Sequence, residues 1–215
     1  MRILAGQAKG RVLHTPSGRG TRPTDSRSRE ALFNILGERV VGARVLDLYA
    51  GTGSVGLEAL SRGAQSCLFV EQNLGAANAI RANIRMCNWQ ENGQVWQTSV
   101  KSALHRMEGH TGEFDIIFAD PPFRDARILE EIERRVDTLS ALLHNVGELS
   151  ESAFAGMLIV QHQHKEKIDL TPQFVLQKAR KTGDSLLSFF ELSPSLSQEV
   201  TEPNQTSSAL ALDEL

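Results

Sequence analysis

Cysteine is scarce in this sequence, and long apolar segments are absent. The 215 residues include only two cysteines, Cys67 and Cys87, which form neither a CxxC pair nor a metal-ligand spacing. They are typical of reduced thiols, so we expect neither a disulfide framework nor a metal site. No run of about 18 apolar residues occurs, so we expect no membrane span. The start, Met1–Gly6, lacks the apolar stretch of a signal peptide, which favours a cytoplasmic location.

Positive charge is sparse outside the first fifth of the chain. The net charge is −3, yet residues 1–44 contain nine basic residues against three acidic ones, which leaves this segment at +6 and the remainder at −9. A basic arm on an acidic body favours a polyanionic partner, because each phosphate contact releases counterions. The alternative is a solvated arm without a specific role. The basic residues that we expect to face the polyanion are Arg2, Lys9, Arg11, Arg22, Arg27 and Arg29.

The basic arm has its own local structure. Residues 1–20 combine glycines with short apolar pairs and predict a small hairpin. The tripeptide 24–26 offers N-cap side chains for a helix over 27–36. Arg27 and Arg29 lie in the first turn of this helix, where positive charge opposes the helix dipole. That placement is favourable if an anion binds there.

From residue 44 onward, short apolar runs alternate with helical patterns. Such alternation predicts a parallel sheet covered by helices on both faces. Two further runs at 174–176 and 186–190, joined by a turn at 182–184, predict an antiparallel pair at the sheet edge. The expected parallel strands are 45–49, 67–71, 95–98, 114–119 and 157–160, and the expected helices are 54–62, 74–88, 100–107 and 125–144.

This pattern divides the chain into three parts. Residues 1–43 form the basic hairpin and helix, and residues 44–192 form an α/β domain. Residues 193–215 carry only acidic charges and lack periodicity, which predicts a disordered tail.

A glycine-rich loop follows the first predicted strand. Residues 47–56 contain the pattern GxGxxG at Gly51, Gly53 and Gly56, directly after a strand and at the start of a helix. Glycines at such a turn let the backbone approach a bound nucleoside closely. Glu71 ends the next strand about 20 residues later, where a carboxylate can bind two ribose hydroxyls. The spacing therefore predicts a nucleoside-binding site.

Asp47 is the residue that distinguishes between two kinds of nucleoside cofactor, a dinucleotide and S-adenosylmethionine. A dinucleotide places its pyrophosphate at the helix N-terminus, and a nearby carboxylate would repel it. S-adenosylmethionine has no phosphate and carries a cationic sulfonium and an ammonium, which an acidic strand end suits. Asp47 therefore favours S-adenosylmethionine over NAD. The alternatives are that Asp47 only caps the turn and that Glu71 is a surface charge.

The tetrapeptide Asp120-Pro121-Pro122-Phe123 follows the fourth predicted strand. Two prolines cannot continue a central strand, so the chain must leave the sheet here in a rigid loop. The Asp120 side chain and the Pro121 carbonyl can accept both N–H groups of a base's exocyclic amine, and Phe123 can stack on the base. These four residues are our candidate catalytic residues. The alternative is a stiff helix-entry turn with Phe123 in the core.

Taken in order, these motifs resemble a known family. Together they resemble the bacterial 16S ribosomal-RNA guanine-N2 methyltransferases of the RsmD type. The segments that carry the resemblance are Arg22-Pro23-Thr24, 27–36, 47–56, 58–64 and 120–123. The opening residues, Gly6, Lys9-Gly10-Arg11 and Leu13, also match. The resemblance covers roughly residues 1–191, and the segment 27–36 is more specific to this family than the glycine loop.

The resemblance implies a fold, a reaction and partners. It implies a Rossmann-like seven-stranded S-adenosylmethionine-dependent methyltransferase fold with a small basic N-terminal extension, acting as a monomer. The implied substrate is a guanine of 16S rRNA, in the small ribosomal subunit or an assembly intermediate, methylated at its exocyclic N2. The residues expected to bind the cofactor are Asp47, Ala50, Gly51, Gly53, Gly56, Glu71, Gln72, Ser99 and Val100.

Three positions depart from the family's pattern. Asp25-Ser26 stands where the family usually has Asp at position 26, and Ser99 stands where a polar acceptor, often Asp, would contact adenine. The fifth strand ends in residues 161–164, Gln-His-Gln-His, instead of an acidic stretch. His162 and His164 have no third clustered ligand, so they do not predict a metal site.

Other classes of function remain open. A DNA or small-molecule amino-methyltransferase would share the fold, although the basic arm favours a nucleic acid. A non-catalytic rRNA-binding assembly factor would not need the intact tetrapeptide at 120–123. An NAD-dependent oxidoreductase is disfavoured by Asp47 and by the absence of an evident acid/base constellation for hydride transfer.

Overall fold

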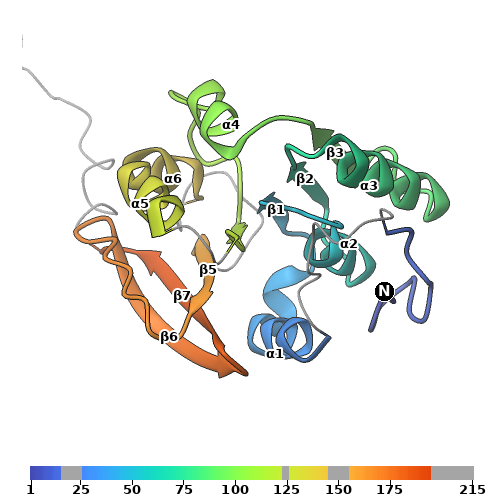
Figure 1. The fold of residues 1–215 in the computed structure, drawn as a ribbon, viewed down its shortest axis with the longest axis horizontal. Coiled ribbons are helices and arrows are strands. Elements are labelled where there is room, and N and C mark those ends of the chain that lie inside the picture. The colour runs from blue at the N-terminus through green and yellow to red at the C-terminus, as the bar shows by residue number, and fades with distance from the viewer. Residues whose placement is uncertain (16–25, 123–125, 145–154, 195–215) are drawn as a thin grey trace, which may run out of the picture.

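The computed structural model describes residues 1–15, 26–122, 126–144 and 155–194. Its centre is one seven-stranded sheet with the strand order β3-β2-β1-β4-β5-β7-β6 (Figure 1). The first five strands are parallel to one another, whereas β7 is antiparallel to both β5 and β6. The strands are β1 Arg44–Leu48, β2 Ser66–Val70, β3 Gly93–Trp96, β4 Ile116–Ala119, β5 Met157–Gln163, β6 Phe174–Thr182 and β7 Ser185–Leu192.

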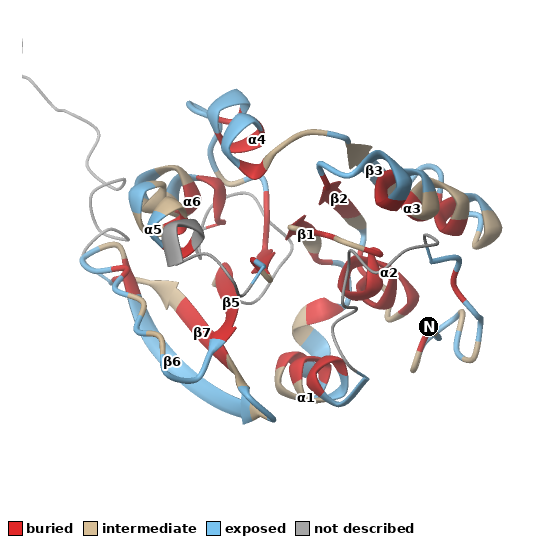
Figure 2. Cartoon of the chain, in the orientation of Figure 1, coloured by how far each residue is buried: buried red, intermediate tan, exposed pale blue. Residues whose placement is uncertain are grey.

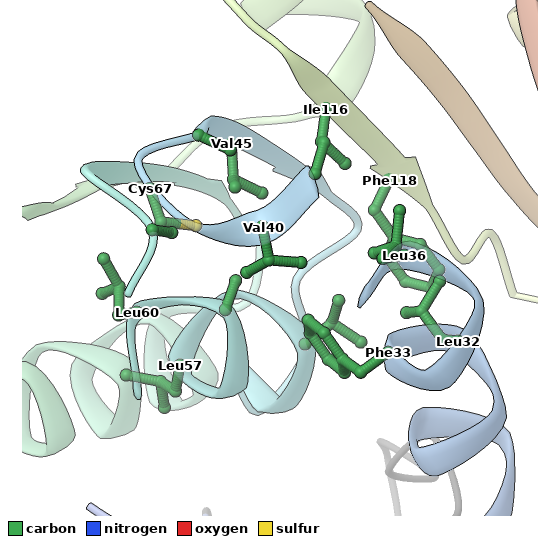
Figure 3. Packing of buried hydrophobic residues seen from close by; sticks show 14 of the residues in the cluster. Leu32, Phe33, Leu36, Val40, Val45, Leu57, Leu60, Cys67, Ile116 and Phe118 are labelled. Atoms are coloured by element: carbon green, nitrogen blue, oxygen red, sulfur yellow. The ribbon is translucent and has the colours of Figure 1, made fainter. Parts of the chain in front are cut away.

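Helices cover both faces of the sheet, as the alternating pattern predicts. One apolar core lies between the sheet and α1, α2 and α3 and includes Phe69 of the sheet. Figure 3 shows part of this core, with Val45, Ile116 and Phe118 on the sheet side. The second lies between the opposite face and α4, α5 and α6. The helices are α1 Ser26–Leu36, α2 Ser54–Ser61, α3 Leu74–Met86, α4 Val100–Arg106, α5 Ala126–Arg134 and α6 Val136–Leu142, with a short 3-10 helix η1 at Gly37–Val40.

One predicted helix is corrected. The expected helix over 125–144 is two helices, because the backbone at Arg135 leaves the helical region with φ −104° and ψ 15°. The N–H of Arg135 donates to the carbonyl of Ile132, three residues back, at 3.1 Å, so the regular ladder is interrupted there.

The strand register brings three strand ends to one edge of the sheet. In the middle of the sheet, Leu48 at the end of β1 is paired with Val70 of β2 and with Ala119 of β4. All three strands are parallel, so the residues that follow them leave the sheet side by side. Ligands of open α/β sheets bind at this carboxyl edge, where the strand order reverses direction.

The predicted antiparallel pair at the sheet edge is confirmed and is longer than expected. β6 and β7 form a hairpin whose turn uses Gly183 at φ +61°. The register of the pairing between β6 and β7 shifts between Leu176 and Lys178. β6 is the outer strand, and most of its residues are exposed (Figure 2).

The N-terminal hairpin is also confirmed. Arg2 and Val12 form an antiparallel bridge, and the N–H of Ile3 donates to the carbonyl of Arg11 at 3.0 Å. Ile3 and Leu13 are buried in the same core as α1, α2 and α3. The basic arm is therefore packed onto the α/β domain.

The predicted C-terminal tail, residues 193–215, lies mostly outside the described residues. Ser193, expected in the tail, is only 6% exposed, and its N–H donates to the carbonyl of Gln173 at 2.9 Å, so the ordered chain reaches beyond β7. Residues 195–215 lie outside the described part. Over the described ranges, the helices are too short or too polar to cross a membrane.

Candidate active site at the carboxyl edge of the sheet

The glycine loop leads from β1 into α2 and has an unusual backbone. Tyr49, Gly51 and Gly53 adopt positive φ angles of 59°, 57° and 74°. A Cβ added at Gly51 would meet only the carbonyl oxygen of Tyr49, at 3.8 Å, so this side of the loop is open to an approaching ligand. A Cβ at Gly53 would lie 2.9 Å from Ile80 Cγ1. Gly53 therefore fits the close contact between the loop and α3, while Gly51 offers the open backbone.

Glu71, directly after β2, holds the glycine loop and the start of α3 together. Its Oε2 accepts the N–H of Gly51 at 2.7 Å, and its Oε1 accepts the N–H of Asn73 at 2.6 Å. The side chain is 8% exposed. Each carboxylate oxygen can accept a second hydrogen bond, so two ribose hydroxyls can donate to the same carboxylate.

The prediction for Asp47 is corrected. The alternation of β1 turns Asp47 toward α2, where it is 2% exposed and its Oδ2 accepts the N–H of Gly56 at 3.0 Å. Burial raises the pKa of Asp47 to about 8, while the bond from Gly56 lowers it and the charges of Asp120 and Glu71 raise it. The raised pKa favours the neutral form of Asp47, and the bond from Gly56 fixes the first turn of α2.

Gly56 also serves packing. A Cβ at this position would lie 2.3 Å from Phe69 Cε1 and 2.5 Å from Cys67 Sγ. A glycine here lets α2 approach β2 closely, the third function expected of a GxGxxG pattern.

The remaining predicted cofactor residues lie around the same edge. Ala50 is buried, and its N–H donates to the carbonyl of Val70 at 2.9 Å. Gln72 is exposed. Ser99 caps α4 by accepting the N–H of Ser102 at 3.2 Å, and Val100 is buried in the second core. Ser99 thus has a local structural role beside any contact with a ligand.

Asp120 follows β4 and is half-buried. The effect of its charge on the pKa of Asp47, together with that of Glu71, places the three carboxyl groups in one electrostatic neighbourhood. Pro121 is buried and Pro122 is exposed, so the chain leaves the sheet here as predicted. Phe123 lies outside the described residues.

The donor set of this edge fits S-adenosylmethionine. Gly51 provides an open backbone for close approach, and Glu71 has acceptor capacity for a ribose diol. Glu71 can bind the ribose of a dinucleotide as well as that of S-adenosylmethionine, so it does not separate the two cofactors. The charge of Asp120 at this edge suits a cationic sulfonium better than a pyrophosphate.

The predicted basic residues separate into two groups. Arg2, Lys9, Arg11 and Arg27 are exposed. Arg29 is corrected: it is 1% exposed, its Nη2 donates to the carbonyl of Arg2 at 2.8 Å, and its Nε lies 3.8 Å from Glu58 Oε2. A cation buried in this way cannot contact a phosphate. Arg22 lies outside the described residues, as do Thr24 and Asp25 of the expected N-cap.

Sequence reasoning assigned no role to two residues that the structure singles out. Glu58, beneath the basic hairpin, is fully buried, and its oxygens accept the N–H groups of Leu4 and Ala5 at 2.8 and 2.9 Å. Gln161 follows Val160, the partner of Ala119, and therefore stands level with Asp120. Its Oε1 is buried and has no hydrogen-bond partner among the described residues. The pairing of β4 with β5 places Gln161 beside Asp120, and the sequence pattern alone does not give that pairing. No group of three metal-ligating side chains is present in the described ranges.

The fold and site together define a class. The sheet order, the glycine loop after β1 and the carboxylate after β2 are those of a Rossmann-like methyltransferase fold, which confirms the predicted fold. Residues 1–191 match the family described as Conserved hypothetical protein 95. The chain belongs to this family, and the predicted resemblance to the RsmD type is confirmed.

Individual relatives agree with this assignment. The protein named Ribosomal RNA small subunit methyltransferase D of Haemophilus influenzae is 33% identical over 186 residues, which are 85% of this chain and 89% of the relative. Its namesake in Escherichia coli K12 is 35% identical over 153 residues, or 71% of each chain. A solved hypothetical protein of Thermus thermophilus has a TM-score of 0.70 and 26% identity, covering 89% of this chain and 99% of that one.

Proposed function

We propose that this protein transfers a methyl group from S-adenosylmethionine to the exocyclic N2 of a guanine in 16S rRNA. The observation that carries the proposal is the pairing of Leu48 with both Val70 and Ala119. This register puts the glycine loop, Glu71 and Asp120 at one edge of the sheet. A donor bound at the loop and an amine held at Asp120 would therefore be neighbours.

The cofactor side of the proposal uses Gly51 and Glu71. S-adenosylmethionine, when bound, supplies an electrophilic methyl group on a positively charged sulfur. The open backbone at Gly51 accommodates the nucleoside, and the Glu71 carboxylate accepts its ribose hydroxyls. Ala50, Gln72, Ser99 and Val100 remain proposed contacts around it.

The target side uses the tetrapeptide at 120–123. An exocyclic amine is a poor nucleophile, because its lone pair is delocalised into the ring. The Asp120 carboxylate and the Pro121 carbonyl would accept its two N–H groups and orient the lone pair away from the ring plane. Phe123 would stack on the base, which is worth roughly 1–3 kcal/mol. Alignment supplies the remaining rate enhancement, so no covalent intermediate is required.

The macromolecular substrate is inferred from charge and from the relatives. Arg2, Lys9, Arg11 and Arg27 are exposed and would contact phosphates, with Arg22 beside them in the sequence. The relatives of H. influenzae and E. coli are named as small-subunit rRNA methyltransferases. We therefore propose the small ribosomal subunit or an assembly intermediate as the partner of a monomeric, cytoplasmic enzyme.

Two substitutions separate the two halves of the site. We expect Asp120→Ala to abolish methyl transfer while the affinity for S-adenosylmethionine stays within about twofold, because Asp120 faces the amine. We expect Glu71→Ala to weaken cofactor binding by at least about tenfold, because a charge-assisted hydrogen bond contributes about 1.5–3 kcal/mol. Calorimetric titration with the cofactor and a radiolabelled methyl-transfer assay measure both effects. Loss of cofactor binding in Asp120→Ala would contradict the assigned role.

A further inference from the structure

The outer strand β6 carries three exposed cations near the carboxyl edge of the sheet. Most of β6 is exposed (Figure 2). Lys178, Arg180 and Lys181 are among its exposed residues and follow one another closely along the strand. Within the described part of the chain, none of them forms an ion pair or a side-chain hydrogen bond. This contrasts with the described arginines that are in ion pairs with acidic side chains, namely Arg29, Arg39, Arg44, Arg62, Arg134 and Arg135.

The register relates these cations to Asp120. Asp120 is level with Gln161 of β5, which is paired with Leu187 of β7, which in turn is paired with Arg180. Asp120 and Arg180 thus occupy one row across the sheet, three strand spacings apart. At about 4.8 Å per spacing, their backbones are roughly 14 Å apart. This distance is suited to contacts with nucleotides that flank a base held at Asp120.

Two of these cations, Lys178 and Arg180, share a side of the sheet with α1, whereas Lys181 alternates to the opposite side. Lys178 and Arg180 are paired with Phe189 and Leu187, both of which lie in the core under α1. Directly paired residues of antiparallel strands point to the same face, so Lys178 and Arg180 lie on that face too. α1 contacts β6, and its first turn carries the exposed Arg27.

We propose that Lys178 and Arg180, hereafter the β6 surface, bind the phosphate backbone of the RNA that carries the target base. This inference rests on the proposed function. The proposed cofactor residues lie after β1 to β3, so we expect the nucleotides next to the target base to extend over the half from β4 to β6, while the basic hairpin contacts phosphates elsewhere on the RNA. Unpaired cations at the far end of that half complement its phosphates.

A simpler role for these cations is protection of an edge strand. Lysine on an exposed edge prevents pairing with another chain. A glutamate at the same position protects an edge equally well, but it repels phosphate. Charge reversal therefore separates the two roles, because it keeps the edge charged and removes the attraction for RNA.

The test compares the full-length wild type with Lys178→Glu/Arg180→Glu. The substrate is small subunits from cells that lack the gene, the binding probe is a small-subunit rRNA transcript, and the control is Arg106→Glu. Arg106 is exposed and lies in the last turn of α4, which packs on the opposite face of the sheet. Binding of the transcript is measured over a range of salt concentrations, and methyl transfer, thermal unfolding and molecular mass are measured in parallel.

We expect the double variant to raise KM for the subunit at least about tenfold, with kcat within about twofold. The slope of log affinity for the transcript against log salt concentration should fall by about 1 for each phosphate that the variant no longer binds. Arg106→Glu should match the wild type. An unchanged KM and salt slope would overturn the proposal and leave edge protection as the role of these cations, since the Glu variant keeps the edge charged.

A second variant and a separate readout keep the result decisive. If the double Glu variant unfolds early, Lys178→Gln/Arg180→Gln must show the same decrease of salt slope with wild-type stability. If the wild type does not methylate the subunit, the proposed function fails. The salt dependence of binding still decides whether the β6 surface contacts RNA.

Discussion

Glu58 shows how one buried carboxylate organises the N-terminal part of the molecule. It accepts the backbone N–H groups of Leu4 and Ala5, forms a 2.9 Å ion pair with Arg62, and lies 3.8 Å from Arg29. A buried charge is tolerated only when it is paired and hydrogen-bonded. These contacts connect the hairpin, α1 and α2, so Glu58 supports the basic arm from within.

Removal of Glu58 should therefore be costly. We expect Glu58→Ala to lower the free energy of unfolding by about 3–5 kcal/mol, because the variant removes a buried carboxylate from beside the Arg29 guanidinium and leaves the Leu4 and Ala5 N–H groups without their acceptor. Glu130→Ala is the control, since the Glu130–Arg134 pair is exposed and such pairs contribute about 0–1 kcal/mol. Urea denaturation measures both values. Equal losses in the two variants would show that the buried pair does not stabilise the fold.

Asp47 should make stability depend on pH. Its folded-state pKa of about 8 exceeds the ordinary value of 3.8, so the folded chain keeps a proton that the unfolded chain loses. Stability should then fall as pH rises from about 4 to 8, by at most about 1.4 kcal/mol per pH unit. Asp47→Asn retains an acceptor for the Gly56 N–H and should remove this part of the pH dependence.

The measurement is urea denaturation of both proteins at pH 5 and pH 8. Relative to the wild type, Asp47→Asn should gain about 1 kcal/mol or more between the two values. Identical pH dependence in the two proteins would mean that Asp47 is ionised in the folded state.

The residue-level errors have identifiable causes. Arg29 precedes Leu32 and Phe33 by three and four positions, so helical spacing already puts it on the buried face of α1. Its charge suggested a surface role, but burial beside Glu58 determines its environment. For Asp47, the alternation of the strand already predicts which face of the sheet the side chain points to. The hydrogen bond that it accepts from the Gly56 N–H could be identified only from the structure.

At the scale of elements, periodicity predicted the order of strands and helices well. Short apolar runs bounded by glycine and polar turns define the parallel strands, because both faces of that sheet are buried. The break at Arg135 was not predictable, since no glycine or proline marks it. The pairing of β7 with β5 and the exact register of β6 on β7, and hence the row that links Asp120 to Arg180, required the tertiary structure.

The docking of the hairpin onto α2 depends on one glycine. Gly6 has φ +79°, and a Cβ there would lie 1.8 Å from the backbone oxygen of Ser61. Gly10 has a similar φ of +84°, but nothing lies within 4 Å of its Cβ position. The two positions thus carry the same backbone strain and differ in contact.

Alanine substitutions use this difference. Gly10→Ala should cost about 1 kcal/mol from strain alone, and Gly6→Ala roughly 1–3 kcal/mol more, because the clash displaces the hairpin from α2. Hydrogen exchange should accelerate at the Leu4 and Ala5 amides only in Gly6→Ala. Equal stability and exchange in the two variants would show that the hairpin is not held by this contact.

On the scale of the whole molecule, the two halves of the mixed sheet carry different parts of the proposed site. The glycine loop and Glu71 belong to the half from β1 to β3, and Asp120 begins the half from β4 to β6. The basic hairpin and the β6 surface lie on elements that flank these halves. This division follows from the reversal of strand order at β1, which the sequence pattern predicts only once the fold class is recognised.

The central claim is that this edge methylates a guanine N2 in small-subunit rRNA. The most direct measurement is mass spectrometry of N2-methylguanosine in that rRNA from cells lacking the gene, complemented with the wild type or with Asp120→Ala. We predict that one N2-methylguanosine is absent without the gene, returns with the wild type, and stays absent with Asp120→Ala. The same modification level in all strains, or full restoration by Asp120→Ala, would contradict the account.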